Sequence, residues 1–213
     1  MERIILVGGG GHCKSIVDSI NGLNQFEIVG VIDKKINENM GLGIDVIGTD
    51  EDLSALYKSG IKNAFISVGS IGNPCIRVRL YNILKNIGYN FPKIIDKTAI
   101  VSESALINDG VFVGKGAIIN TKVTIEKQCI INSGTIVEHD CNIREFVHLA
   151  PGVTLSGGVS VGKRTHVGTN STIIQNVTIG NDVIVGAGSV IIKDIKNGFK
   201  VYGNPGKEAY VYE

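Results

Sequence analysis

The sequence predicts two folds in succession. An α/β domain with a small Rossmann-like parallel sheet is expected over residues 1–95, followed by an all-β, left-handed parallel β-helix of hexapeptide repeats over residues 96–213. From Val101 onward every sixth residue is a branched aliphatic, sixteen times in succession. Before residue 92 the chain instead alternates apolar runs, glycine turns and helical patterns. The 28 glycines and an aromatic content of only 6% are typical of thin cores with frequent turns.

The period of six defines the second domain. It fits neither a helix nor an alternating strand, and it is typical of a triangular coil in which three six-residue walls make one turn. Each aliphatic then points into the prism and stacks on the residue 18 positions later, one coil away, about 4.8 Å along the axis. Repeats of this kind normally coil left-handed, although the spacing does not determine the hand. The aliphatic positions are Val101, Ile107, Val113, Ile119, Ile125, Ile131, Val137, Ile143, Leu149, Leu155, Val161, Val167, Ile173, Ile179, Val185 and Ile191.

Small or β-branched residues precede each aliphatic by two positions, from Ala99 to Ser189. We expect them near the corners, where a bulky side chain would collide with the next coil. Glycine or asparagine directly follows several aliphatics, as at Gly114, Gly162 and Asn132. Because these residues favour tight or left-handed backbone, they are expected to make the turns.

Strand, turn and helix patterns alternate in the first domain, which favours a three-layer α/β fold with a parallel sheet. Apolar runs predict strands at 3–7, 26–32 and 64–68, and helical patterns lie at 15–20, from Thr49 to near Gly60, and from Asn73 through Leu84.

Ligands of parallel sheets bind beyond the carboxyl ends of the strands. The segments expected at that edge are Gly8–His12, Asp33–Lys35 and Gly69–Asn73. A glycine turn at a helix N-terminus offers N–H groups and a positive dipole end to a phosphate, and Asp33 is placed for ribose or base contacts. A purely structural turn that binds nothing is the alternative. A dinucleotide redox cofactor is disfavoured because the domain lacks a second nucleotide-binding half.

Charge and cysteine content narrow the function classes. A formal net charge of +1 does not indicate a protein that binds nucleic acid. No apolar run approaches the roughly 20 residues that a membrane span needs. The chain opens on a strand and a turn rather than a signal peptide. Cys129 and Cys141 fall on small-residue positions, whereas Cys13 and Cys75 are isolated. We therefore expect a reduced, cytoplasmic protein without structural zinc.

Three of the four histidines lie in the coil: His139, His148 and His166. None holds an inward aliphatic position, so core filling does not explain them, and a solvent-exposed histidine on a polar wall is the alternative to a functional one. His139 is flanked by Glu138 and Asp140. A carboxylate that accepts from one ring nitrogen fixes the tautomer and raises the basicity of the other nitrogen, as a general base requires.

The spacing of these histidines predicts their separation in one chain. His139 and His148 are nine residues apart, half of an 18-residue coil, so they lie on different walls and could meet only between subunits of a three-fold assembly. His166 follows His148 by 18 residues and stacks one coil below it. A three-histidine metal site, as in gamma-class carbonic anhydrases, is the competing hypothesis. The carboxylate beside His139 and the nucleotide-type first domain argue against it.

Three motifs carry a family resemblance: VGGGGH at the start, IVEHDCNIREFVHLAPG in the coil and VYGNPGK at the end. In these the chain resembles the bacterial sugar acyltransferases related to sialic acid O-acetyltransferase, the NeuD/PglD-like hexapeptide family, and more closely the branch that N-acetylates UDP-4-amino-sugars. The resemblance covers nearly the whole chain. It implies acetyl-CoA as donor, a homotrimer, a nucleotide-sugar site in the first domain and catalysis at the subunit interface; no metal is expected.

The resemblance also implies residue roles. His139 would be the general base, with Asp140 as the carboxylate beside it, where related enzymes can carry glutamate. Gly206 departs from the family's alanine in the tail motif. The implied substrate-binding residues are Gly8, Gly9, Gly10, Gly11, His12, Asp33, Lys34, Gly69 and Asn132. The implied acetyl-CoA-binding residues are His148 near the thioester carbonyl or pantetheine arm, Gly157, His166, Gly168, Gly186, Asn204, Pro205, and Lys207 toward a CoA phosphate.

The predicted function is N-acetylation of a UDP-4-amino-sugar by direct transfer from acetyl-CoA. No covalent enzyme intermediate is required, since the coil cysteines fill packing positions. O-acetylation of sialic acid or another sugar is the alternative, because the same base serves an amine and a hydroxyl. A metal-dependent hydratase and a non-catalytic nucleotide-sugar-binding protein are further hypotheses.

Overall fold

A computed structural model describes residues 1–34 and 43–211, with side chains up to residue 207. The chain forms two compact units, Met1–Gly69 with Cys75–Ile94, and Ser70–Pro74 with Ile95–Glu213. We call them the α/β unit and the coil unit. The short segment Ser70–Pro74 lies between two elements of the α/β unit along the chain but groups with the coil unit.

The α/β unit contains a four-stranded parallel sheet in the order β3-β2-β1-β4, which confirms the Rossmann-like expectation. All three predicted strands are present, and the helix expected at 15–20 extends further at both ends. The strand β3 was not predicted, because its three residues are too few to show the alternation of apolar and polar side chains. The elements are β1 (Glu2–Val7), α1 (Gly11–Leu23), β2 (Phe26–Ile32), β3 (Val46–Gly48), the 3-10 helix η1 (Asp50–Asp52), α2 (Leu53–Lys58), β4 (Asn63–Ile66) and α3 (Cys75–Ile87).

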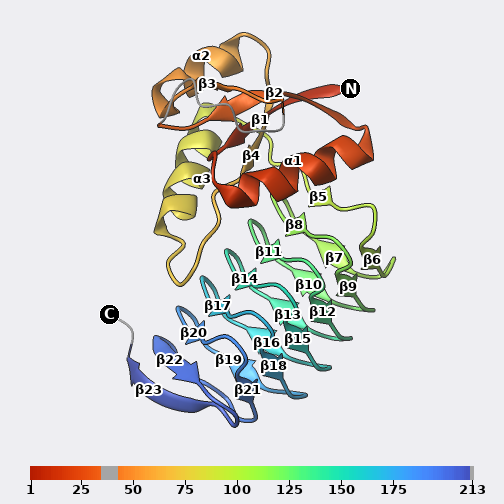
Figure 1. Cartoon of the computed structure of the whole chain (residues 1–213), viewed down its shortest axis with the longest axis vertical. Helices are drawn as coiled ribbons and strands as arrows, with labels where there is room; N and C mark the ends of the chain where they lie inside the picture. The colour runs from red at the N-terminus through yellow and green to blue at the C-terminus, as the bar shows by residue number, and fades with distance from the viewer. Residues whose placement is uncertain (35–42, 212–213) are drawn as a thin grey trace. The chain divides into compact units, whose positions relative to one another are not determined.

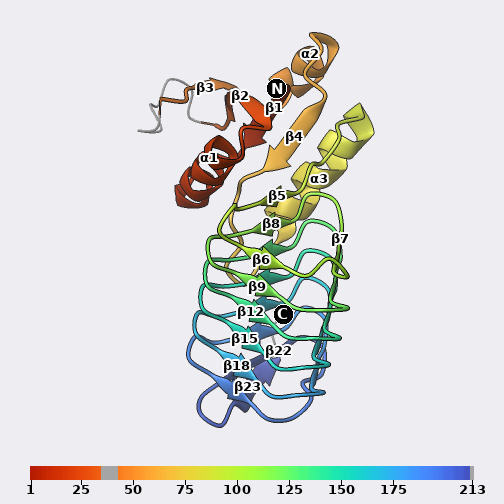
Figure 2. The same ribbon diagram turned by 90° about the vertical axis from the view of Figure 1, so that its right-hand side faces the viewer.

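Both faces of this sheet are buried. Ile5 of β1 packs in one cluster with Leu80 and Leu84 of α3. Ile4 and Leu6 are also fully buried, and the two-residue period of a strand turns them to the opposite face. Helices therefore cover the sheet on both sides, as α1 and α3 do in Figure 2.

The coil unit is a triangular prism with three parallel walls (Figure 1). Wall 1 contains β6 (Ile100–Val101), β9 (Ile118–Ile119), β12 (Ile136–Val137), β15 (Thr154–Leu155), β18 (Thr172–Ile173) and β21 (Val190–Ile191). Wall 2 contains β7 (Leu106–Ile107), β10 (Thr124–Ile125), β13 (Asn142–Ile143), β16 (Ser160–Val161) and β19 (Thr178–Ile179). Wall 3 contains β5 (Ile94–Ile95), β8 (Phe112–Val113), β11 (Ile130–Ile131), β14 (His148–Leu149), β17 (His166–Val167), β20 (Ile184–Val185), β22 (Phe199–Tyr202) and β23 (Lys207–Val211).

The interior confirms the six-residue period and the left-handed parallel β-helix. Each aliphatic from Ile107 to Ile191 is buried, and pairs such as Ile125 with Ile143 lie 18 positions apart in register. The preceding small residues also point inward. The hydroxyls of Thr135, Thr165 and Ser171 donate to a carbonyl 15 positions later, for example from Thr165 Oγ1 to Gly180 O at 2.7 Å, whereas Ser189 Oγ donates to Gly186 O at 2.7 Å. These hydroxyls are buried, and each is satisfied by a hydrogen bond to a backbone carbonyl oxygen.

The corners correct one expectation from the sequence. Left-handed residues lie three positions before the aliphatic, as at Gly110 and Lys122, and not directly after it. Gly162 follows Val161 and needs no side chain for another reason: an added Cβ would lie 2.5 Å from Gly180 O of the next coil. Asn132 makes its turn through its side chain, since Oδ1 accepts from the Ser133 N–H at 2.8 Å. Close approach between coils, rather than a positive φ, selects glycine directly after the aliphatic.

The last strand departs from the parallel pattern, because β23 pairs antiparallel with β22. Over residues 1–34 and 43–211 no helix has the length and apolar character needed to cross a bilayer.

Candidate functional site

His139 and Asp140 lie at the corner between walls 1 and 2, in the turn that joins β12 to β13. His139 Nδ1 and Asp140 Oδ2 are 2.8 Å apart. Asp140 occupies the left-handed corner position with φ of 62°. The side chains are 55% and 57% exposed, so the pair is accessible from outside the prism.

This pairing determines what His139 can do. A carboxylate only accepts, so the Nδ1 of a neutral His139 carries the hydrogen and Nε2 keeps its lone pair. Gly157 lies beneath the ring one coil away, where an added Cβ would come within 2.6 Å of Nε2. The absence of a side chain at Gly157 therefore leaves the space that the ring occupies. Glu138, on the other flank, accepts from Asn120 Nδ2 at 2.7 Å.

His148 lies on wall 3 and is only 7% exposed, so the alternative of a solvent-exposed histidine does not hold at this position. Its Nδ1 is 2.6 Å from the carbonyl oxygen of Ser70. Its Nε2 is 3.3 Å from Nδ2 of Asn132. Both ring nitrogens therefore meet groups of this chain.

His166 stacks one coil below His148, as the spacing predicts, with ring centroids 4.9 Å apart in an edge-on arrangement. It is 9% exposed, so the solvent-exposed alternative is wrong here too. Burial lowers the pKa of His166, which keeps the ring neutral near pH 7. Within the described part of the chain, its Nδ1 is buried without a hydrogen-bond partner.

In the α/β unit, Asp33 closes the glycine turn. Its Oδ2 accepts from the Gly9 N–H at 2.5 Å, and its Oδ1 accepts from the Lys34 N–H at 2.6 Å. The carboxylate therefore joins the turns that follow β1 and β2. Contact of Asp33 with a ribose or a base stays a prediction. The carboxylate of Asp33 already accepts hydrogen bonds from two backbone N–H groups. Lys35 lies outside the residues that the structure describes.

Gly8 is required by the geometry of the same turn. Its φ is 110°, and an added Cβ would collide with Val68 Cγ2. Gly10 and Gly11 instead have no atom within 4 Å of an added Cβ. Gly11 begins α1, and the N–H groups at the start of a helix point away from its own carbonyls, which is the feature that anions use. Of these groups, the Cys13 N–H already donates to Gly10 O at 3.0 Å.

His12 lies in that first turn beside Gly69, where an added Cβ would be 3.5 Å from the His12 Cβ. Burial, and secondarily the charge of Arg77, lowers the pKa of His12 to about 4. His12 is therefore a neutral hydrogen-bonding group at pH 7 and not a cation. Arg77 is itself buried and donates to the carbonyl oxygens of Ile66, at 2.9 Å, and of Val68, at 2.5 Å.

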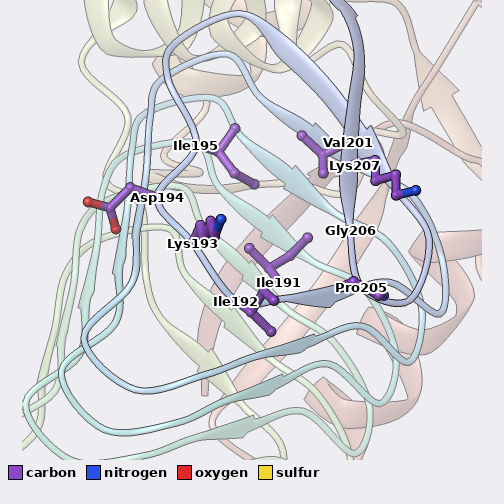
Figure 3. A pocket seen from close by; sticks show the side chains of 9 residues that line it. All are labelled: Ile191, Ile192, Lys193, Asp194, Ile195, Val201, Pro205, Gly206 and Lys207. Carbon is purple, nitrogen blue, oxygen red and sulfur yellow. The ribbon is translucent and has the colours of Figure 1, made fainter.

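The C-terminal segment lines a cavity of about 420 Å³ at the end of the coil (Figure 3). Ile191, Ile195 and Val201 are its apolar lining, and Pro205 and Lys207 border it. The peptide bond from Asn204 to Pro205 is cis. Gly168 and Gly186 lie elsewhere, after the aliphatics of β17 and β20 at the corner between walls 3 and 1, where each approaches the next turn of the chain closely.

The structure thus separates the predicted site residues into five groups, one of which is the pair Gly168 and Gly186 described above. His139, Asp140 and Gly157 meet at one corner, and Asn132, His148 and His166 meet on wall 3. The residues of the glycine turn form a third group, in which Asp33 accepts from the Gly9 N–H, and the tail residues form a fourth at the end of the coil. Three residues near these groups were not predicted from the sequence: Ser67, whose hydroxyl donates to Gly8 O at 2.6 Å, Ser70 and Arg77. Arg77 alone could have been noticed, because it is a charged residue among the apolar positions of a predicted helix.

Known proteins show the same two-part organisation. Residues 3–84 match the model of the PglD N-terminal domain, and residues 158–193 match the bacterial transferase hexapeptide model of six repeats. A histidine mutant of perosamine N-acetyltransferase from Caulobacter crescentus, in complex with CoA and GDP-perosamine, is 32% identical with a TM-score of 0.93, covering 99% of this chain and 98% of its own. This chain belongs to the PglD-like family of hexapeptide sugar acetyltransferases.

Two further structures extend the comparison for this PglD-like protein. The acetyltransferase domain of PglB from Neisseria gonorrhoeae, in complex with acetyl coenzyme A, is 32% identical with a TM-score of 0.90, covering 98% of this chain and 99% of that one. WeeI from Acinetobacter baumannii, at 22% identity and a TM-score of 0.86 over 98% of this chain and 100% of its own, shares the fold. No curated protein sequence matches. The predicted family is confirmed, and the protein is an acyltransferase.

Proposed function

We propose that this PglD-like protein transfers the acetyl group of acetyl-CoA to the amino group of a UDP-4-amino-sugar, with His139 as general base. The observation that carries the proposal is the His139–Asp140 pair, joined at 2.8 Å and half exposed. It supplies a ring with a fixed tautomer and an accessible Nε2. The relatives bound to CoA with GDP-perosamine, or to acetyl coenzyme A, support the two substrate classes.

The chemistry follows from this pair. The acceptor nitrogen attacks the thioester carbonyl carbon, and a C–N bond forms while His139 Nε2 takes the amine proton. The tetrahedral intermediate collapses, the C–S bond breaks, and the imidazolium returns the proton to the departing CoA sulfur. Asp140 stabilises the imidazolium through Nδ1–H. A positioned base contributes about 10²–10⁴-fold, and holding both substrates together contributes more.

Binding of the nucleotide is assigned to the glycine turn. The first-turn N–H groups of α1, near Gly10 and Gly11, are proposed to meet the diphosphate, with neutral His12 beside it. Lys34 and Gly69 border the same turn. The open space above Gly10 and Gly11 supports this assignment.

A homotrimer in the cytoplasm is proposed as the working state. His139 and Lys207 lie in different parts of the same coil unit. We therefore propose that acetyl-CoA binds along the coil unit of a neighbouring subunit, which would bring its thioester to His139. The acetyl-CoA-binding residues proposed on the family resemblance are His148, Gly157, His166, Gly168, Gly186, Asn204, Pro205 and Lys207. Sedimentation should give a trimer, and a fully active monomer would contradict the interface site.

The decisive experiment measures thiol release from acetyl-CoA with UDP-4-amino-sugars and with sialic acid as acceptors. We expect turnover with the UDP-amino-sugar and its loss in His139→Ala with an unchanged melting temperature. Full activity of His139→Ala would dismiss His139 as the base. Turnover only with sialic acid would establish the O-acetyltransferase alternative, for which the same base would serve.

A further inference from the structure

Arg77 belongs to α3 and is buried in the α/β unit, where only 1% of its surface is exposed. Its terminal nitrogen Nη1 donates to two carbonyl oxygens, that of Ile66 at 2.9 Å and that of Val68 at 2.5 Å. Ile66 is the last residue of β4, and Val68 follows it by two positions. Because a buried charge is costly unless polar groups compensate it, the two carbonyls account for the position of the guanidinium.

These two carbonyls lie on the outer edge of β4. The strand is at the end of the sheet, and on its inner side the Ser67 N–H donates to a carbonyl oxygen of β1 at 2.9 Å. Consecutive residues of a strand direct their peptide groups to opposite edges, so the carbonyls of Ile66 and Val68 face away from β1. The backbone of Asn90 pairs with the beginning of this outer edge, and Arg77 supplies the donor at its end.

The residues that follow β4 contact the glycine turn. Ser67, which is fully buried, donates from Oγ to Gly8 O at 2.6 Å. Val68 lies against Gly8, where an added Cβ would be 2.9 Å from Val68 N. Gly69 comes next and lies beside His12, in the first turn of α1. All of these residues belong to the α/β unit, so the end of β4 is in contact with both the beginning of the glycine turn and the helix that follows it.

From these contacts we infer that Arg77 is a positioning residue for the nucleotide: it holds the end of β4, and thereby keeps Gly8 and Gly69 in place around the turn where the diphosphate is proposed to bind. The inference rests on the proposed function for the assignment of the diphosphate to this turn. The charge of Arg77 contributes, after burial, to the lowered pKa of His12, which agrees with a guanidinium close to the first turn of α1.

The substitutions Arg77→Met and Arg77→Lys test this role. Since one nitrogen serves both carbonyls, the Nζ of a lysine can replace Nη1, whereas a methionine of similar length has no donor. We expect Arg77→Met to weaken UDP binding about tenfold in calorimetry, the size expected for the loss of a hydrogen bond from a charged group. Arg77→Lys should bind UDP within about threefold of wild type. The KM for the nucleotide sugar should follow the UDP affinity, and the KM for acetyl-CoA should not change, because its proposed binding residues belong to the coil unit.

Arg79→Met is the matched control. Arg79 lies on the same helix, but its side chain is 56% exposed and pairs with Asp50 at 3.2 Å, so UDP affinity should stay at the wild-type value. Ser67→Ala tests the next contact and is informative even where Arg77→Met does not fold. It removes the hydrogen bond to Gly8 O, and we expect UDP binding to weaken about fivefold.

Three results would overturn the inference. They are UDP affinity within about threefold of wild type in a folded Arg77→Met, wild-type UDP affinity in Ser67→Ala, and equal weakening in Arg77→Met and Arg79→Met. A wild-type protein that binds UDP but transfers no acetyl group would refute the proposed acetyl transfer and leave the role of Arg77 standing. A wild-type protein that binds neither UDP nor GDP would refute the nucleotide site, and this inference with it.

Discussion

Replacing Gly157 by alanine tests whether the position of the His139 ring controls the rate of acetyl transfer. An added Cβ would lie 2.5 Å from His139 Cε1 and 2.6 Å from Nε2. Non-bonded carbon atoms settle about 3.5 Å apart, so the ring must retreat by about 1 Å. The backbone of Gly157 is not in the left-handed region, and the half-exposed ring can move without repacking the interior.

The expected loss follows from this displacement. A catalytic group displaced by about 1 Å costs about 10²-fold in rate, which corresponds to about 2.7 kcal/mol in the activation free energy. We therefore expect the kcat for thiol release to fall about 100-fold in Gly157→Ala. The KM for the nucleotide sugar and the melting temperature should stay near wild type, because Gly157 contributes neither to the buried core nor to the glycine turn.

The double variant His139→Ala/Gly157→Ala is the control. If Gly157 acts only through the ring, its substitution should have no further effect once the ring is gone. A kcat of Gly157→Ala within about threefold of wild type would refute the reasoning, as would a second, independent loss in the double variant.

Three further predictions concern stability. Gly8→Ala should lower the free energy of unfolding by at least about 1–2 kcal/mol, because φ is 110° and the new Cβ meets Val68; urea unfolding measures it. The pKa of His12 is lowered to about 4, so between pH 4 and 6.5 the unfolded state binds a proton that the folded state does not. The free energy of unfolding should therefore fall as pH drops through this window, by up to about 3 kcal/mol, as urea titrations at pH 7 and pH 4.5 would show. Ile143→Ala, in the prism interior at 0% exposure, should cost about 2–5 kcal/mol.

Matched variants distinguish these effects from general damage. Gly10→Ala adds a Cβ with nothing within 4 Å, so a loss as large as that of Gly8→Ala would contradict the packing argument. His12→Gln should flatten the acid side of the stability profile, and an unchanged profile would exclude His12 as its source. Thr124→Ala, on the outer side of the wall that contains Ile143, should change the free energy of unfolding by less than about 0.5 kcal/mol.

The triangular coil could be predicted because its defining contacts repeat at a constant separation. Ile125 pairs with Ile143 at the same 18-residue distance that relates every other inward position, so the pattern is visible along the chain. The turns were harder to predict. Lys122, Gln128 and Phe146 adopt left-handed backbone despite having no preference for it, because closure of each corner imposes that conformation on whichever residue occupies it.

The sequence by itself determined the prism, the parallel sheet and the His139–Asp140 pair, since each depends on neighbours or on a constant period. Only the tertiary structure decided which groups hold Ser70 and Gly9. The bond from His148 to Ser70 spans 78 residues, and that from Gly9 to Asp33 spans 24. These bonds follow no period, and they form only after strands and coils have been packed, because the partners are brought together by burial of apolar faces elsewhere in the chain.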